Sequence, residues 1–78
     1  MTWNYRVLRQ VQNGEPYLAI YEVYYDKNGR ANAMTANPIA IQGETLEELM
    51  EAYKMQAEAF AQPVLDYDKI PEPDAEPM

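Results

Sequence analysis

The chain of 78 residues contains no cysteine, no histidine and no serine. Without cysteine, disulfide bonds and thiolate metal sites are excluded. Without histidine, the chain lacks the commonest general base, the commonest metal ligand and the side chain best suited to switch near neutral pH. The threonines, Thr2, Thr35 and Thr45, therefore have no histidine to activate them as nucleophiles. We expect a protein that is not an enzyme and that holds no cofactor.

Basic residues are also scarce, since 6 lysines and arginines stand against 13 aspartates and glutamates. The formal net charge is −7 and the pI is near 4.3. Nucleic-acid binders need clustered basic residues to displace counterions, so nucleic acid is not an expected partner. An anionic membrane surface is disfavoured for the same reason. A basic protein surface suits this charge, although solubility alone also explains it.

Long apolar runs are missing as well. The N-terminus has no basic segment followed by an apolar run, so no signal peptide is expected. No stretch is long enough to span a bilayer, and the expected compartment is the cytoplasm. A chain of this length forms one domain with a modest core, which is often helped by a partner or a second copy.

Alternating apolar side chains predict strands in the first half of the chain. Residues 3–11 have the period of two that is typical of a half-buried strand. A turn is predicted at 13–16, and residues 17–26 form the strongest predicted strand. A second turn at 26–29 leads to a weaker edge strand within 34–42.

The pairing of the first two strands can also be predicted. Placing Val7 opposite Tyr21 leaves a loop of residues 12–16 and sets Arg6 opposite Glu22 as a favourable charge pair. The same register sets Trp3, Tyr5 and Val11 opposite Tyr25, Val23 and Tyr17. A shift by one residue would mix the two faces of the hairpin.

A helix is predicted from Thr45, which forms a capping box with Glu48, to about Ala61 before Pro63. Its apolar stripe consists of Leu46, Leu49, Met50, Tyr53, Ala57 and Phe60. The predicted fold is α+β, a three-stranded antiparallel meander with this helix on one face and a possible short strand within 64–67. Residues 1–68 would form the domain, and residues 69–78 a disordered, acidic, proline-rich tail.

One helix covers only one face of such a sheet. The candidate partner-binding residues on the other face are Leu8, Leu18, Ile20 and Tyr24. On the solvent-exposed flank of the helix the candidates are Glu47, Glu51 and Glu58. Simpler explanations are also open for these residues. Tyrosines commonly pack against their neighbours within a sheet, and glutamates commonly form the solvent-exposed face of a helix. If the hypothesis holds, changing Leu8 and Ile20 to serine abolishes association.

Carboxylates also gather near the end of the chain, at Asp66, Asp68, Glu72 and Asp74. They are separated by prolines and have no glycine-turned loop of the kind that calcium sites need. No metal site is expected.

The chain resembles the HicB-type antitoxin domain in three places. These are Gly-Glu-Thr-Leu-Glu-Glu-Leu at 43–49, a helix with Ala57 and Ala59, and Ile-Pro-Glu-Pro at 70–73. It also resembles a group of small bacterial proteins that open with Trp-Asn-Tyr-Arg and later carry Glu-Val-Tyr-Tyr-Asp. The HicB resemblance implies a domain that binds a small basic RNA-cleaving toxin. Residues 37–40 depart from that family's Asp-Leu-Pro-Gly segment, and its DNA-binding region is expected to be missing.

Three functional hypotheses follow. The leading one is a non-catalytic protein-binding module, HicB-like, which could form homodimers and bind a small basic protein. The alternative is an acidic inhibitor that mimics nucleic acid and occupies a basic protein. The third, a small-molecule or metal-assisted activity, would give heat on titration with divalent ions or nucleotides.

Overall fold

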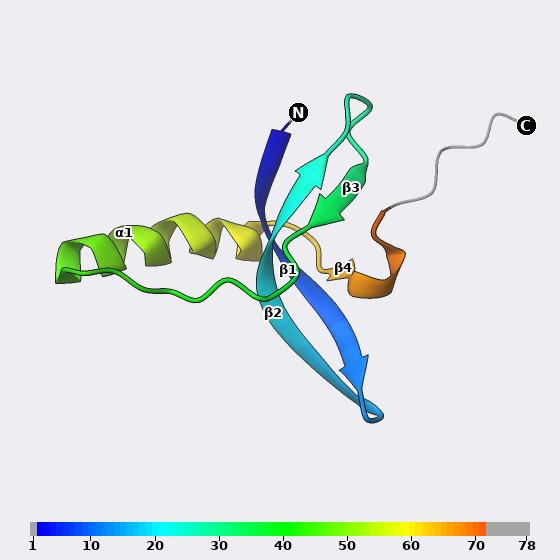
Figure 1. Ribbon diagram of the computed structural model, residues 1–78, viewed down its shortest axis with the longest axis horizontal. Helices are drawn as coiled ribbons and strands as arrows, with labels where there is room; N and C mark the ends of the chain where they lie inside the picture. The colour runs from blue at the N-terminus through cyan, green and yellow to red at the C-terminus, as the bar shows by residue number, and fades with distance from the viewer. Residues whose placement is uncertain (1, 72–78) are drawn as a thin grey trace, which may run out of the picture.

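The computed structural model describes residues 2–71. Its elements are β1 (Thr2–Gln12), β2 (Glu15–Tyr25), β3 (Ala31–Met34), α1 (Leu46–Ala57), η1 (Glu58–Ala61), β4 (Leu65–Asp66) and η2 (Tyr67–Lys69). The strands form one sheet in the order β3-β2-β1-β4, with β4 parallel to β1 (Figure 1). The predicted α+β class and strand meander are confirmed. The sheet has four strands rather than three, because the short strand after the helix joins its edge.

The β1–β2 hairpin is tighter than predicted. Asn13 and Gly14 have φ angles of 52° and 81°, and Gln12 pairs with Glu15, so the turn has two residues. Positive φ at both central positions is the geometry that Asn-Gly favours in hairpins. Val7 therefore pairs with Ile20 and not with Tyr21, and the predicted register and 12–16 loop are wrong by one residue.

This shift exchanges the two faces of β2 relative to β1. Arg6 lies opposite Tyr21 instead of Glu22, and Leu8 lies opposite Ala19. The core cluster consists of Leu8, Tyr21, Val23 and Ala31. Leu8, predicted to be exposed at a docking face, is fully buried with 0% exposure. That prediction is wrong, because the residue points into the core.

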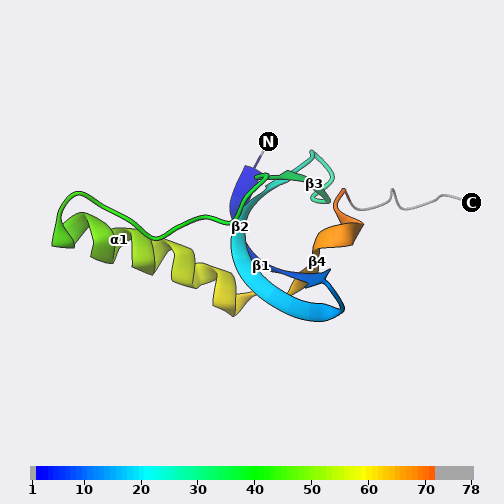
Figure 2. The same cartoon turned by 60° about the horizontal axis from the view of Figure 1, so that its bottom comes forward.

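The hairpin is strongly curved, with η2 on its concave side and α1 extending from its convex side (Figure 2). On the concave side the Tyr67 ring stands edge-on to Tyr21, with 5.7 Å between ring centroids. Ile70 also packs against the core cluster. The folded part thus includes Ile70, although the tail was predicted to begin at residue 69. The rest of that tail prediction concerns residues 72–78, which lie outside the described residues.

The third strand lies earlier than predicted, at Ala31–Met34 instead of within 34–42. The turn before it is stabilised by the carboxylate of Asp26, which accepts hydrogen bonds from the amides of Arg30 (3.1 Å) and Asn28 (2.8 Å). The Arg30 amide is the main reason that the pKa of Asp26 lies below its ordinary value of 3.8. After β3, residues 35–45 form an extended arm. The arm remains joined to β2 where the Ile39 amide donates to the Ile20 carbonyl at 2.8 Å.

Thr45 caps α1 as predicted, since its hydroxyl accepts a hydrogen bond from the Glu48 amide at 3.1 Å. The Glu48 carboxylate accepts a hydrogen bond from the Glu44 amide at 2.9 Å, whereas a capping box would use the amide of Thr45. However, α1 does not cover the sheet. It extends away from it and meets it only near η1 (Figure 1). Among residues 2–71 no helix has the length and hydrophobicity needed to cross a membrane.

Candidate protein-binding surface

The apolar stripe of α1 faces solvent. Its large members Leu46, Leu49, Met50, Tyr53 and Phe60 have exposed fractions between 37% and 71%, with Leu46 the most exposed. Twelve residues in α1 give a helix about 18 Å long. The stripe was predicted as the part of the core that covers the sheet. The structure instead presents it as a free surface.

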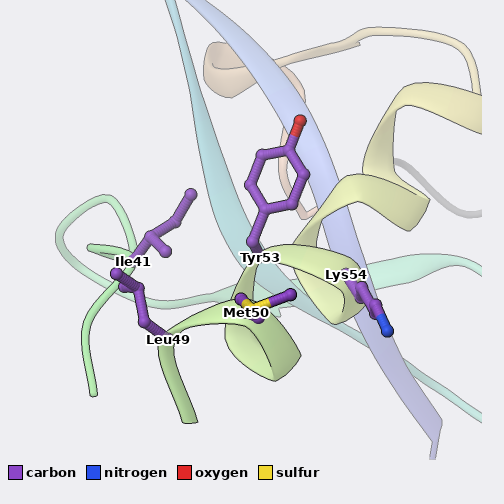
Figure 3. A pocket seen from close by; sticks show the side chains of 5 residues that line it. All are labelled: Ile41, Leu49, Met50, Tyr53 and Lys54. Atoms are coloured by element: carbon purple, nitrogen blue, oxygen red, sulfur yellow. The ribbon is translucent and has the colours of Figure 1, made fainter. Parts of the chain in front are cut away.

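The arm supports α1 along one side. The buried side-chain amide of Gln56 donates a long hydrogen bond of 3.5 Å to the Ala40 carbonyl, which places the middle of the arm beside the helix. At Gly43 the arm backbone comes so close that an added Cβ would lie 2.6 Å from the Leu49 amide nitrogen. Ile41 of the arm, with Leu49, Met50 and Tyr53 of α1, lines an open hollow of about 490 Å³ (Figure 3). The arm and α1 therefore act as one projecting unit with an apolar surface.

A second hollow of about 340 Å³ lies where this unit meets the sheet. In this base hollow the large apolar side chains are Val7, Leu18, Ile20, Phe60 and Val64. Ala59 is fully buried and fixes η1 at this point. Leu18, Phe60 and Val64 are each more than half exposed. Apolar surface thus continues from the stripe onto the convex face of the hairpin.

The predicted binding residues do not all meet. Leu18 and Ile20 lie in the base hollow, whereas Leu8 is buried on the opposite face of the sheet. Tyr24 is half-buried and lies farther along the same face of β2 as Ile20. Its hydroxyl donates to the Glu22 carboxylate at 2.6 Å, and this hydrogen bond raises the pKa of Tyr24. Tyr24 is therefore already engaged within the chain.

Glu47, Glu51 and Glu58 are exposed along the flank of α1, as predicted. Lys54 approaches Glu51 at 3.9 Å, but both side chains are largely exposed, so this pair adds little to stability. Within residues 2–71 no group of three or more acidic side chains is placed to hold a metal ion. The flank is a solvated acidic surface beside the apolar stripe.

Arg6 was predicted to pair with Glu22, but it instead joins the hairpin to the segment after η1. Its guanidinium is buried and donates to the Tyr25 hydroxyl at 2.9 Å and to the Pro63 carbonyl at 2.7 Å. The Pro63 bond ties the chain leaving η1 to the hairpin. Phe60 and Val64 were missed as surface residues, although the seven-residue spacing of Leu46, Tyr53 and Phe60 was visible in the sequence.

Comparison of the chain with protein-family models, curated proteins and solved structures gave no match. The HicB-type resemblance therefore stays a prediction.

Proposed function

We propose that this chain is a non-catalytic protein-binding module whose binding element is α1 with its arm and the base hollow. The observation that supports this proposal is the uncovered apolar stripe on a helix that stands away from its own sheet. Contiguous apolar surface of this kind marks interaction sites. An amphipathic helix presented in this way is a recurrent means of protein recognition.

The energetics support a bound state. Isolated helices of about 12 residues are marginal in water, because most helical stability in proteins comes from packing of the apolar face. Here α1 has 12 residues, and its stripe is exposed. Burial of apolar surface contributes about 25 cal/mol per Å², so covering the stripe stabilises both the helix and the complex.

The acidic flank bears on the kind of partner. Glu47, Glu51 and Glu58 lie beside the stripe, and the chain carries a net charge of −7. Such a field attracts a basic protein and speeds its association at low salt. This proposal agrees with the small basic toxin that the HicB-type resemblance implies.

Affinity capture followed by calorimetry with the purified partner tests the proposed function. We expect Leu46→Ser with Tyr53→Ser to abolish binding, because Tyr53 lies at the centre of the exposed stripe and Leu46 is its most exposed member. Val11→Ser is the matched control, since Val11 is exposed and apolar but lies at the far end of the hairpin. Equal binding by the double variant and the control would refute the proposal.

The alternative, an inhibitor that mimics nucleic acid, rests on the glutamates exposed along α1. It differs in one measurable respect. A mimic competes with DNA or RNA for its target, and changing Glu47, Glu51 and Glu58 to glutamine abolishes inhibition while the apolar substitutions do not.

A further inference from the structure

Two large apolar side chains of the stripe lie at equal distances along the chain from Tyr53, Leu46 at the start of α1 and Phe60 in η1. Leu46 lies seven residues before Tyr53 and Phe60 lies seven residues after it, and all three side chains are exposed. Residues seven apart fall on nearly the same side of an α-helix, which places Leu46 and Tyr53 on one side of α1, and η1 continues the helix to Phe60. If two such helices pack antiparallel, Tyr53 of each copy meets at the centre and Leu46 of one copy meets Phe60 of the other.

The two ends of this unit are also complementary. Leu46 is the first residue of α1, at the end of the helix that points away from the sheet (Figure 1), and it is 71% exposed. The base hollow, with Leu18, Phe60 and Val64, is an apolar depression at the other end. An antiparallel pair brings the tip of each copy to the base of the other. A two-fold interface needs this reciprocity, because each contact must occur twice.

From these observations we infer that a second copy of this chain covers the apolar surface, in a two-fold dimer built on antiparallel packing of α1 against α1. The inference rests on the proposed function, because it names the occupant of the same surface. The acidic flanks of both helices then face outward and remain free for a basic protein.

The exposed area is sufficient for such a dimer. The five large side chains of the stripe, together with Ile41, Leu18 and Val64, are on average about half exposed. At about 200 Å² for the full surface of a large apolar residue, they offer roughly 800 Å² per chain. A standard stable interface buries about 800 Å² per partner.

Among residues 2–71, no segment covers the stripe. Ile70 packs against the core, and the last described residues lie on the concave side of the hairpin, away from α1 (Figure 2). Residues 72–78 are Glu-Pro-Asp-Ala-Glu-Pro-Met, which include three acidic residues and two prolines. A segment of that composition has little apolar surface to place on the stripe.

The chain is also extended for its length. Its radius of gyration is 14.1 Å and its principal dimensions are 52 × 34 × 21 Å. A compact domain of this size has a radius of gyration of about 11–12 Å. The arm and α1 extend away from the sheet (Figure 1), and a second copy would enclose them.

Cysteine cross-linking tests the arrangement directly, because the natural chain has no cysteine. A residue on the two-fold axis is the one that meets its own copy. We expect Tyr53→Cys to form a disulfide-linked dimer of 18 kDa, twice the 9.0 kDa chain, under mild oxidation. Met55→Cys is the matched control, since Met55 is exposed but lies about 200° around the helix from Tyr53. Equal cross-linking of the two variants would overturn the arrangement.

Sedimentation equilibrium of the unmodified chain and of Leu46→Ser provides the second measurement. We expect a reversible dimer that Leu46→Ser weakens at least about tenfold and that Val11→Ser leaves unchanged. A chain that is monomeric at every concentration overturns the inference. If that monomer still captures a protein in a manner lost in Leu46→Ser, the inference fails and the proposed function stands. If no such capture occurs, both fail.

Discussion

At the scale of single residues, Arg6 and Tyr21 are neighbours across the hairpin with different roles. Arg6 is a buried cation whose observed hydrogen-bond acceptors are neutral, the Tyr25 hydroxyl and the Pro63 carbonyl. Hydrogen bonds from a charged donor are about twice as strong as neutral ones. The Tyr25 hydroxyl in turn donates to Asn4 at 2.7 Å, which extends the network along the sheet.

Replacing Arg6 with methionine keeps much of the side-chain volume but removes both hydrogen bonds. We expect the free energy of unfolding to fall by about 1–3 kcal/mol. Urea denaturation followed by circular dichroism measures this loss. Lys27→Met, at an exposed turn position, is the control, and we expect its urea midpoint to equal that of the unmodified chain within error. An unchanged midpoint in Arg6→Met would show that the buried network contributes nothing net.

Tyr21 makes the free energy of unfolding depend on pH in the alkaline range. Its burial raises the pKa of its hydroxyl well above the ordinary value of 10.0, with Tyr17 adding to the effect. Because the folded pKa exceeds the unfolded one, the contribution is fully present below pH 10 and declines as pH rises further. We expect unfolding free energy to fall above pH 10, and less steeply in Tyr21→Phe. Denaturation curves at pH 9, 10 and 11 check this, and identical slopes in both proteins would contradict it.

At the scale of elements, local signals predicted most of the elements but not the register. Asn13 and Gly14 were recognised as a turn, yet Pro16 was kept out of the strand and the loop was made too long. Pro16 is tolerated in β2 because β3 pairs with β2 only at Val23–Tyr25, so the other edge is open there. The proline's missing N–H therefore costs no ladder hydrogen bond. The Thr45 cap was predicted because it depends on four adjacent residues alone.

The contact between the arm and α1 depends on Gly43. A methyl group there would lie within 3 Å of the helix backbone at Glu48 and Leu49, and backbone cannot move aside cheaply. We expect Gly43→Ala to separate the arm from α1 and to destabilise the fold by about 1–3 kcal/mol. Thermal unfolding measures the loss. Gly14→Ala is an informative comparison, because its surroundings are open and its cost of about 1 kcal/mol comes only from positive φ.

At the scale of the whole molecule, the position of α1 is what sequence reasoning could not predict. A stripe such as that from Leu46 to Phe60 shows that a helix needs an apolar surface to pack on. It does not show whether that surface belongs to the same chain. The register error compounded this, because it placed Leu8 on the outer face of the sheet. Phe60 was assigned to the stripe that covers the sheet, and Val64 to a possible short strand. The candidate surface therefore emerged only when the arm, α1 and the convex face were seen together.

The charge of the whole chain distinguishes a second copy from a basic partner. Two copies with a net charge of −7 each repel one another, and salt screens that repulsion over about 8–10 Å. We expect the dimer to tighten as NaCl rises from 20 to 300 mM, whereas binding of a basic protein should weaken over the same range. Sedimentation equilibrium across this series measures the first effect. A dimer that dissociates as salt rises would mean that ion pairs, rather than the apolar stripe, hold the copies together.

Dilution should also change the secondary structure, because α1 is too short to be stable when its stripe is exposed. We expect the helical circular dichroism signal to fall as the protein is diluted below the dimer dissociation constant, with the sheet signal retained. The oxidised Tyr53→Cys dimer is the control, since its covalent link keeps the helices paired at any concentration. A helical signal independent of concentration in a protein that demonstrably dissociates would show that the arm alone stabilises α1. Gln56 and Gly43 would then be the residues responsible, and pairing of the helices would add association without adding to the fold.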